Sequence, residues 1–323
     1  MSHPYKPIDL SKLRTLSVHD RRHKADVKSL AQLPAPGASV AQWLASLPDY
    51  LGAKTLRSIV TAIADAVRAA RPVVAAFGAH VIKVGCGPIL VDLVKRRIVS
   101  ALVANGACAI HDVELALTGQ TSEEVADTIR DGSFGMVAET LDFFDAATAI
   151  ASRCNIGLGE AIGRLLIERK APNREVSVFA AAVEHEIPIT VHVAFGTDTV
   201  HVSPRLDGAA LGAATLHDFR LLCDVVADLG AKGPSPIGGV WLNIGSAVLL
   251  PEVFLKAVSV ARNLGANLDA LTTANLDMIR HYRPNQNVVS RPVMPGRGHE
   301  LLGHHEIMLP LLRQAVIDSL TLT

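Results

Sequence analysis

The chain has 323 residues, of which 49% are apolar and only 4% aromatic, and its 31 Lys and Arg residues balance 31 Asp and Glu. This length suffices for one large domain or two small ones, with a core built from Ala, Val, Leu and Ile. The zero net charge gives no global attraction to nucleic acid or to an acidic membrane surface, so we expect small molecules or other copies of the chain as partners.

The four cysteines, Cys86, Cys108, Cys154 and Cys223, are far apart and form no CxxC pair. This argues against a disulfide framework or a zinc ribbon and predicts reduced, buried thiols. The segment MSHPYKPIDLSKLR contains no apolar signal sequence, and the longest apolar stretch, around Ile98–Ile110, is too short to span a bilayer. We therefore expect a cytoplasmic protein.

Residues 1–71 are predicted to form an arm followed by helices. Residues 1–35 are polar and basic and include HDRRHKADVK, which is typical of a segment that ranges over the surface or over a neighbouring subunit. Ser39–Leu51 and Lys54–Ala70 then carry apolar residues at helical spacing.

From residue 72 onward, short apolar runs alternate with helical patterns. The predicted strands are 72–77, 99–104, 187–193, 240–244 and 270–273. The predicted helices are 88–97, one from about residue 110, one begun by TSEEVADTIR, 133–170, 175–186, 216–229, 251–264 and 306–320. This alternation predicts a single α/β domain over 72–323, a doubly wound and mainly parallel Rossmann-like sheet with right-handed crossovers.

Small and polar residues follow the predicted strands. Because ligands bind at the carboxyl ends of strands in open α/β sheets, these residues are the candidate site. They are Gly78, His80 and Gly85; Asn105, Gly106, Ala107, His111 and Asp112; Asp198 and His201; Gly245 and Ser246; and Thr272, Thr273 and Ala274. Small residues let backbone N–H groups approach phosphates, so their recurrence over five strands indicates a nucleotide although no GxGxxG or GxxxxGK[ST] motif is present.

The stretch GHELLGHHEIMLPLL, 298–312, raises the question of a metal site. His304 and His305 could ligate a metal with Asp198 or His201. Adjacent histidines on one element point in different directions, however, and no HExxH or HxH spacing is present, so we predict no metal. His111 and Glu114 share one helix face, which is equally the pattern of a plain solvated pair.

The order of these loops resembles deoxyhypusine synthase, a homotetrameric NAD enzyme with a Rossmann-like parallel sheet, from about Val73 to Leu320. FGAHVIKVG, SALVANGACAIHD, IPITVHVAFGTD, WLNIGSAV, LTTAN and LLGHHEIMLPLL stand where that family has its strand-end turns. The resemblance implies NAD as cofactor and active sites shared across a dimer interface. It further implies that Asp112 and Asp198 face the substrate, and that the NAD site is lined by Gly85, Ala107, Gly245, Thr273, Ala274 and His304.

The chain departs from that family at its essential residue, a lysine that forms an imine with the substrate in a Ser-Trp-Gly-Lys motif. Here the stretch from Arg283 to Arg291 reads RPNQNVVSR. Arg291 stays protonated and cannot form a Schiff base, and the acids that would hold a polyamine are replaced by Asn285 and Gln286. A pocket with guanidinium groups favours a carboxylate or phosphate. Alternatively, these arginines pair with Asp269, Asp277 or Glu300 at a subunit interface.

We therefore expect an NAD-dependent enzyme that acts on a small polar, anionic metabolite by net or transient hydride transfer, rather than a deoxyhypusine synthase. A histidine among His111, His192, His201 and His304 would be the base, Asp198 or Asp112 would orient the substrate, and Arg283 and Arg291 would clamp it. Asn285, Gln286 and His192 complete the predicted substrate site, and His304 and His305 the cofactor site.

Three other functions remain open. One is an aminobutyl transferase of the homospermidine synthase type. Another is a metal-dependent hydrolase or lyase built on Asp198, His201, His304 and His305, and the third is an NAD-binding protein without catalysis. In each case we expect a homo-oligomer, a dimer or a tetramer.

Overall fold

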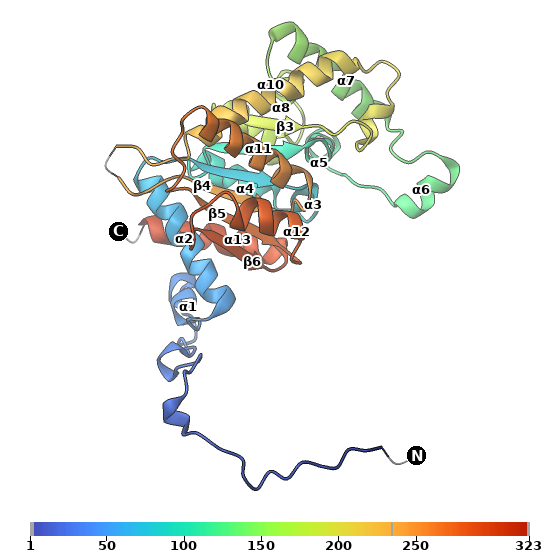
Figure 1. Ribbon diagram of the computed structural model, residues 1–323. Helices are drawn as coiled ribbons and strands as arrows, with labels where there is room; N and C mark the ends of the chain where they lie inside the picture. The colour runs from blue at the N-terminus through green and yellow to red at the C-terminus, as the bar shows by residue number, and fades with distance from the viewer. Residues whose placement is uncertain (1–2, 234, 322–323) are drawn as a thin grey trace.

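A six-stranded, all-parallel sheet forms the centre of the molecule (Figure 1). The computed structural model describes residues 3–233 and 235–321. Within them the strands are β1 (Val73–Phe77), β2 (Ala101–Asn105), β3 (Ile189–His192), β4 (Val240–Ile244), β5 (Thr272–Asp277) and β6 (Gly298–Leu302). Their order is β3-β2-β1-β4-β5-β6. Successive strands are added from β1 to one edge of the sheet as β2 and β3, and then from β4 to the other edge as β5 and β6, so the switch point lies between β1 and β4. The predicted doubly wound α/β fold is confirmed.

The larger core lies on one face of the sheet. It includes Val73, Ala75 and Phe77, every second residue of β1. The helices that contribute to it are α2 (Leu51–Arg68), α3 (Ala79–Lys83), α4 (Gly87–Lys95), α5 (Gly106–Thr118), α7 (Ala138–Cys154), α8 (Leu158–Glu168), α9 (Val178–Glu184), the first half of α10 (Gly208–Ala227) and α13 (His305–Thr321). Because α2 packs in this core, the boundary after residue 71 is not a gap in packing; the predicted division of the chain stays a prediction.

A smaller core lies on the other face, against Val74 and Ala76 of β1. Trp241 of β4 stacks on Phe254 of α11 with ring centroids 4.1 Å apart. The elements on this face are the second half of α10 (Gly208–Ala227), α11 (Leu249–Asn263) and the π-helix η5 (Asn285–Ser290), which follows α12 (Tyr282–Pro284). The first half of α10 joins the larger core, so α10 spans the edge of the sheet at β3.

Several predicted boundaries were wrong. β6 was not predicted because its sequence, GHELL, lacks an apolar run. It can lack one because it is an edge strand, which has a neighbouring strand on one side only and is therefore less buried than the central strands. The single helix predicted over 133–170 is two helices, α7 and α8, because Asn155 ends α7 in the left-handed conformation. β5 runs from Thr272 to Asp277 rather than over 270–273. α3 was also not predicted.

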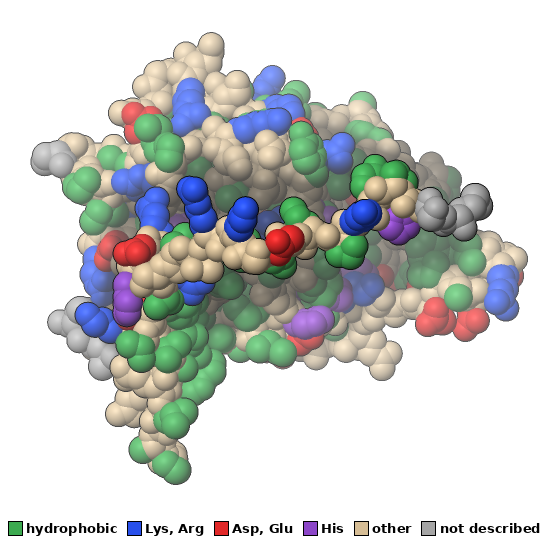
Figure 2. Space-filling model, turned by 60° about the horizontal axis from the view of Figure 1, so that its bottom comes forward, with side chains coloured by type: hydrophobic (Ala, Val, Ile, Leu, Met, Phe, Trp, Pro, Cys, Tyr) green, Lys and Arg blue, Asp and Glu red, His purple; other side chains and the backbone are tan. Residues whose placement is uncertain are grey.

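From residue 3 onward, the described part of the N-terminal arm extends away from the body of the molecule (Figure 1), and Lys and Arg side chains stand along it (Figure 2). Their regular elements are η1 (Val18–Asp20) and η2 (Val27–Ser29), and α1 (Val40–Ser46) follows against α13. Large apolar side chains are exposed along this arm, at Tyr5, Ile8, Leu10, Leu13, Leu16, Val18, Val27, Leu30 and Leu33. The remaining short elements are α6 (Val125–Asp131), η3 (Arg174–Val176) and η4 (Thr199–Val202).

Two further predictions can be compared with the structure. Cys86 and Cys108 are buried as expected, whereas Cys154 is exposed and Cys223 only partly buried. Of the helices within residues 3–233 and 235–321, none combines the length and the apolar character that a membrane span requires.

Candidate functional site

Two glycine turns meet at the carboxyl edge of the sheet, where β1 and β4 end side by side. The Gly78 N–H donates to the Ile244 carbonyl at 2.8 Å. A Cβ atom at Gly78 would lie 2.0 Å from the Gly245 carbonyl oxygen, and one at Gly245, whose φ is +64°, would lie 2.6 Å from His305 Nε2. Neither position has room for a side chain, because the two turns and His305 pack closely together at the switch point, the place where doubly wound sheets bind their ligands.

His305 begins α13 directly against this turn. Its side chain is buried, and its Nδ1 atom has no hydrogen-bond partner. Its ring lies 6.1 Å from that of His80, edge to face. Burial lowers the pKa of His305 and outweighs the opposing charge of Asp277, so the ring is neutral at neutral pH. A ligand that pairs with Nδ1 would satisfy a buried polar atom whose isolation costs about 1–3 kcal/mol.

Asp198 lies at the other end of the same edge, after β3. Its Oδ2 atom is so close to the first residue of α5 that a Cβ atom at Gly106 would lie only 2.0 Å from it. Burial raises the pKa of Asp198, although the neighbouring His201 and the Thr197 hydroxyl oppose this. The carboxylate lies beside the amino terminus of α5, the end of a helix that favours negative charge.

His201 holds a defined orientation beside Asp198. Its Nδ1 atom accepts hydrogen bonds from the backbone N–H groups of Gly196, at 3.0 Å, and Asp198, at 3.3 Å. The neutral ring therefore carries its proton on Nε2, which lies 3.9 Å from Asp198 Oδ2. Phe195 stacks on the ring at 5.5 Å. The structure thus brings the predicted pair Asp198 and His201 together.

A cavity of about 430 Å³ adjoins Asp198. Its walls are α5, the end of α3, the loop segments on either side of α6, and the start of α7. Its charged lining residues are Lys83, Glu114, Glu123, Glu139 and Asp198, and the partly buried His111 and Ala107 also line it. Carboxylates therefore outnumber cations in this cavity. Glu123 and Glu139 were not among the predicted site residues.

Two predicted site residues lie elsewhere. Asp112 is buried and accepts hydrogen bonds from the Ser177 hydroxyl and the Val178 N–H, so it holds the start of α9. Burial raises its pKa to about 6. His192 is buried in β3 beside Thr190, and burial lowers its pKa to about 4. These placements do not fit the predicted contact with substrate, because both side chains point into packed protein.

The predicted cofactor residues divide in a similar way. Gly78, Gly106, Gly245 and His305 lie along the carboxyl edge, whereas Thr272 to Ala274 lie at the start of β5, because that strand continues to Asp277. Thr273 donates its hydroxyl to the Val288 carbonyl under η5. Asn105 caps α5 through the Cys108 N–H, and the Ser246 hydroxyl accepts from the Leu250 N–H. Gly85, His80 and His304 are exposed.

The predicted anion site lies on the opposite face of the sheet from the cavity. Arg283 pairs with Glu252 of α11 at 3.4 Å, and Arg291 donates to Asn287 at 3.1 Å. Asn285 accepts from Gln286 at 3.3 Å. Arg280 pairs with Glu300 within the same chain, and the alternative prediction of pairing at a subunit interface stays a prediction. Neither Arg283 nor Arg291 lines the cavity.

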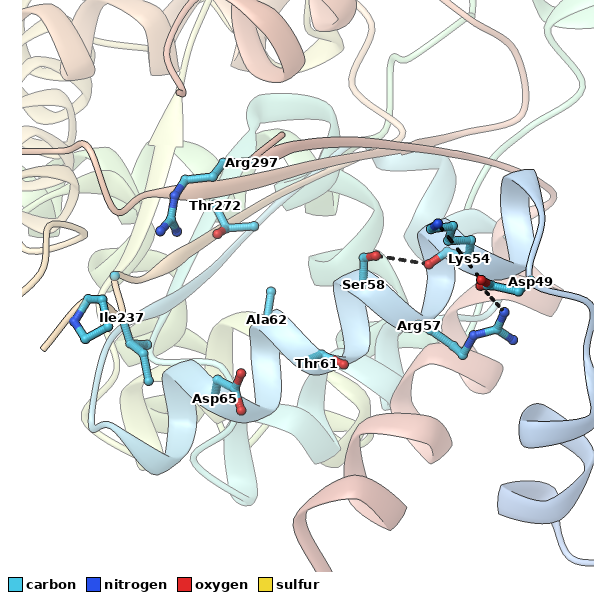
Figure 3. A pocket seen from close by; sticks show the side chains of 12 residues that line it. Asp49, Lys54, Arg57, Ser58, Thr61, Ala62, Asp65, Ile237, Thr272 and Arg297 are labelled. Atoms are coloured by element: carbon cyan, nitrogen blue, oxygen red, sulfur yellow. Dashed lines mark hydrogen bonds and ion pairs between the residues drawn. The ribbon is translucent and has the colours of Figure 1, made fainter. Parts of the chain in front are cut away.

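A second hollow, of about 620 Å³, opens at the amino edge of the sheet beside α2 (Figure 3). Its charged side chains largely contact one another or backbone. Arg57 lies 2.9 Å and Lys54 3.9 Å from Asp49, and Arg297 donates to the Ala270 carbonyl. Because this hollow is remote from the strand ends where ligands bind, we place the candidate site at the carboxyl edge.

Within the described part of the chain, no three His, Cys, Asp or Glu side chains gather closely enough to hold a metal ion. Asp198 and His201 lie at the β3 side of the edge, whereas His305 lies at the β4 side. The four residues of the metal-dependent alternative therefore do not form one cluster.

Comparisons with known proteins give the fold. No family model and no curated protein matches the chain. AgrE, solved as a ternary complex with ornithine and NAD+, superposes with a TM-score of 0.55 at 15% identity over 83% of this chain and 33% of AgrE. A protein from Entamoeba histolytica assigned as a deoxyhypusine synthase gives 0.55 at 12% identity over 87% of this chain and 94% of its own.

A third similar structure, assigned as an LOR/SDH protein from Methanococcus maripaludis S2, gives a TM-score of 0.50 at 14% identity over 84% of this chain and 71% of its own. The chain thus spans about a third of the length of AgrE but nearly all of the Entamoeba protein. At these identities the likeness shows the fold, and at that level it confirms the resemblance to deoxyhypusine synthase.

Proposed function

We propose that the chain is an NAD-dependent enzyme that oxidises, permanently or transiently, a small polar molecule carrying an amino group. One observation carries the proposal: the β1/β4 switch point, where the chain turns at Gly78 and Gly245, lies on the same edge of the sheet as a cavity in which carboxylates predominate. The fold is shared with AgrE, whose structure contains ornithine and NAD+, and this supports the pairing of such a cofactor with an amine.

The switch point suits a dinucleotide for two reasons. Gly78 and Gly245 present backbone where any side chain would collide, and the buried Nδ1 atom of His305 has no partner within the described chain. We infer that these three residues hold the cofactor. NAD+, when bound, would supply the hydride acceptor. The neutral ring of His305 could donate or accept a hydrogen bond without placing a charge beside the cofactor.

The cavity favours a cationic group over the anionic metabolite expected from the sequence. The cavity is lined by four carboxylates, Glu114, Glu123, Glu139 and Asp198, and by one cation, Lys83. An ammonium group would therefore be attracted into it and a carboxylate repelled. Arg283 and Arg291, on which the expected anion site rested, lie on the other face and contact Glu252 and Asn287. Asp198, fixed over the amino terminus of α5, would orient the substrate's amino group.

The aminobutyl-transferase alternative stays open because of Lys83. Unlike Arg291, this residue lines the cavity and carries an amine. A transferase of that type needs an amine that forms an imine with the substrate. Borohydride treatment during turnover should label Lys83 if this reaction occurs, whereas simple oxidation leaves it unmodified.

Calorimetry with NAD+ tests the proposal, followed by NADH absorbance with a panel of diamines and basic amino acids against dicarboxylates of equal length. Gly245→Ala should abolish NAD+ binding, since its Cβ would displace His305. Gly212→Ala on α10, where nothing lies within 4 Å of the added Cβ, is the matched control and should bind normally. Absence of binding heat and of thermal stabilisation in the unmodified protein would refute the cofactor assignment.

Assembly remains part of the proposal. The exposed apolar residues of the arm and the expected sharing of sites between subunits lead us to propose a dimer or a tetramer. Light scattering that gives the mass of a single chain would contradict it.

A further inference from the structure

A chain of hydrogen bonds links His111 to Glu114 through the hydroxyl of Thr121. His111 Nδ1 lies 2.7 Å from Thr121 Oγ1, and Thr121 Oγ1 lies 2.5 Å from Glu114 Oε2. The other carboxylate oxygen, Glu114 Oε1, accepts from the Thr140 hydroxyl at 3.1 Å. His111 and Glu114 are one turn apart on α5, whereas Thr121 lies beyond the Gly119 cap and Thr140 lies on α7.

Counting protons along this chain fixes the state of the histidine. A threonine hydroxyl has one hydrogen, and the ionised Glu114 has none to give, so Thr121 must donate to Glu114. Thr121 Oγ1 can then only accept from His111, and the hydrogen between them belongs to His111 Nδ1. In the neutral ring this leaves Nε2 with a free lone pair.

We propose that His111 Nε2 is the proton acceptor of the cavity, and that Thr121 and Glu114 are positioning residues that hold it in this tautomer. The assignment of a catalytic base rests on the proposed function; the tautomer does not. When the substrate's C–H electron pair leaves as hydride to the NAD+ of the proposed function, the proton from the adjacent N–H or O–H group would pass to Nε2 and a C=N or C=O bond would form. The resulting imidazolium keeps its Nδ1 hydrogen bond to Thr121, and Glu114 faces it with opposite charge.

The surroundings of the ring suit this role. Burial lowers the pKa of His111, and Lys83 on α3 adds to this while Glu114 opposes it, so the ring is neutral and can accept a proton at neutral pH. Glu123, Glu139 and Asp198 are the other charged groups that line the cavity. His201, by contrast, uses Nδ1 as an acceptor and has a proton on Nε2, so it lacks a free lone pair.

The relay also ties the base to the segment that walls the cavity. Thr121 belongs to the loop between α5 and α6. The loop between α6 and α7 is joined to it by a hydrogen bond from the Gly135 N–H to Glu123 at 2.9 Å. A hydroxyl on this loop therefore sets which nitrogen of a helix residue is protonated.

Nuclear magnetic resonance of ¹⁵N-histidine-labelled full-length protein tests the tautomer without cofactor or substrate. We expect His111, assigned from the signals lost in His111→Gln, to be protonated on Nδ1 and bare on Nε2 above its pKa. Thr121→Val, which keeps the shape but removes the hydroxyl, should abolish this preference, and Thr121→Ser should restore it. The proposed hydrogen-bond chain from His111 through Thr121 to Glu114 would be overturned if His111 were protonated on Nε2 in the wild type, or if Thr121→Val left the His111 signals unchanged.

Once a substrate is found, the same variants separate positioning from folding. Thr121→Val should lower kcat about 10- to 100-fold, because it misorients the base without removing it, whereas full general-base catalysis contributes about 100- to 10,000-fold. It should also shift the acidic limb of the pH–rate profile, where the base becomes protonated, while Thr121→Ser recovers most of the activity. If the NMR result holds but no NAD+ binds, the proposed function fails and the relay stands. If NAD+ binds and His111→Gln turns over normally, the base assignment is wrong.

Discussion

Substituting Gly106 by alanine should disable the site by displacing Asp198 alone. The added Cβ would lie 2.0 Å from Asp198 Oδ2, whereas ordinary contact begins at 3.4 Å, so the carboxylate must retreat by about 1.4 Å, the difference between the two. Misplacement of a catalytic group by about 1 Å costs on the order of 100-fold in rate, or about 2.7 kcal/mol of transition-state stabilisation.

The fold should tolerate the change, because Gly106 starts α5 at a negative φ, where alanine gains about 0.5–1 kcal/mol in helix propensity. The assay is a double-mutant cycle of Gly106→Ala with Asp198→Ala, read by chemical unfolding and by kcat/KM. In the Asp198→Ala background the clash is gone, so Gly106→Ala should become neutral or stabilising and have no further effect on turnover. Equal effects of Gly106→Ala in both backgrounds would refute the reasoning.

The other predictions concern charge. Burial raises the pKa of Asp218 from its ordinary value of 3.8 to about 7. Between these two pH values the folded state keeps a proton that the unfolded state has lost, so the protein loses stability as pH rises, by about 1.4 kcal/mol per pH unit. Asp218→Asn should flatten that slope in unfolding curves, and an unchanged slope would show that Asp218 is ionised in the fold. Burial lowers the pKa of His192 to about 4, so its contribution runs the other way, with stability lost as pH falls below about 6.5, and His192→Asn should reduce that loss. Arg283→Ala and Arg291→Ala should leave KM within about twofold of wild type, since both lie on the far face of the sheet, and a tenfold increase would restore the anionic-substrate prediction.

The sequence was sufficient to predict the sheet because its central strands are short apolar runs between turn residues. Val240–Ile244 was predicted to the residue, and Gly78 and Gly245 were found because they follow such runs. β6 lacked that signal. The end of β5 was missed because Asn275 and Asp277 read as loop residues, although both are buried in the strand.

The cavity was harder to predict because it depends on which helix face points outward. Asp112 and Glu114 are two residues apart, so their side chains point in nearly opposite directions around α5. Periodicity alone did not say that Asp112 turns to Ser177 and Glu114 to the cavity. Thr121 lies ten residues from His111 in a loop, and no spacing rule joins a loop hydroxyl to a helix histidine.

The carboxyl edge is electrically asymmetric along its length. At the β3 end the amino terminus of α5 already faces the Asp198 carboxylate, so a second anion there would meet repulsion rather than attraction. At the β4 end the edge presents backbone and the neutral ring of His305, with the charge of Asp277 acting on that ring. A cation is consequently favoured at the β3 end, and an anionic group is disfavoured beside Asp198. If the proposed cofactor binds, this difference would keep its pyrophosphate away from the β3 end and so favour one of its two possible orientations along the edge.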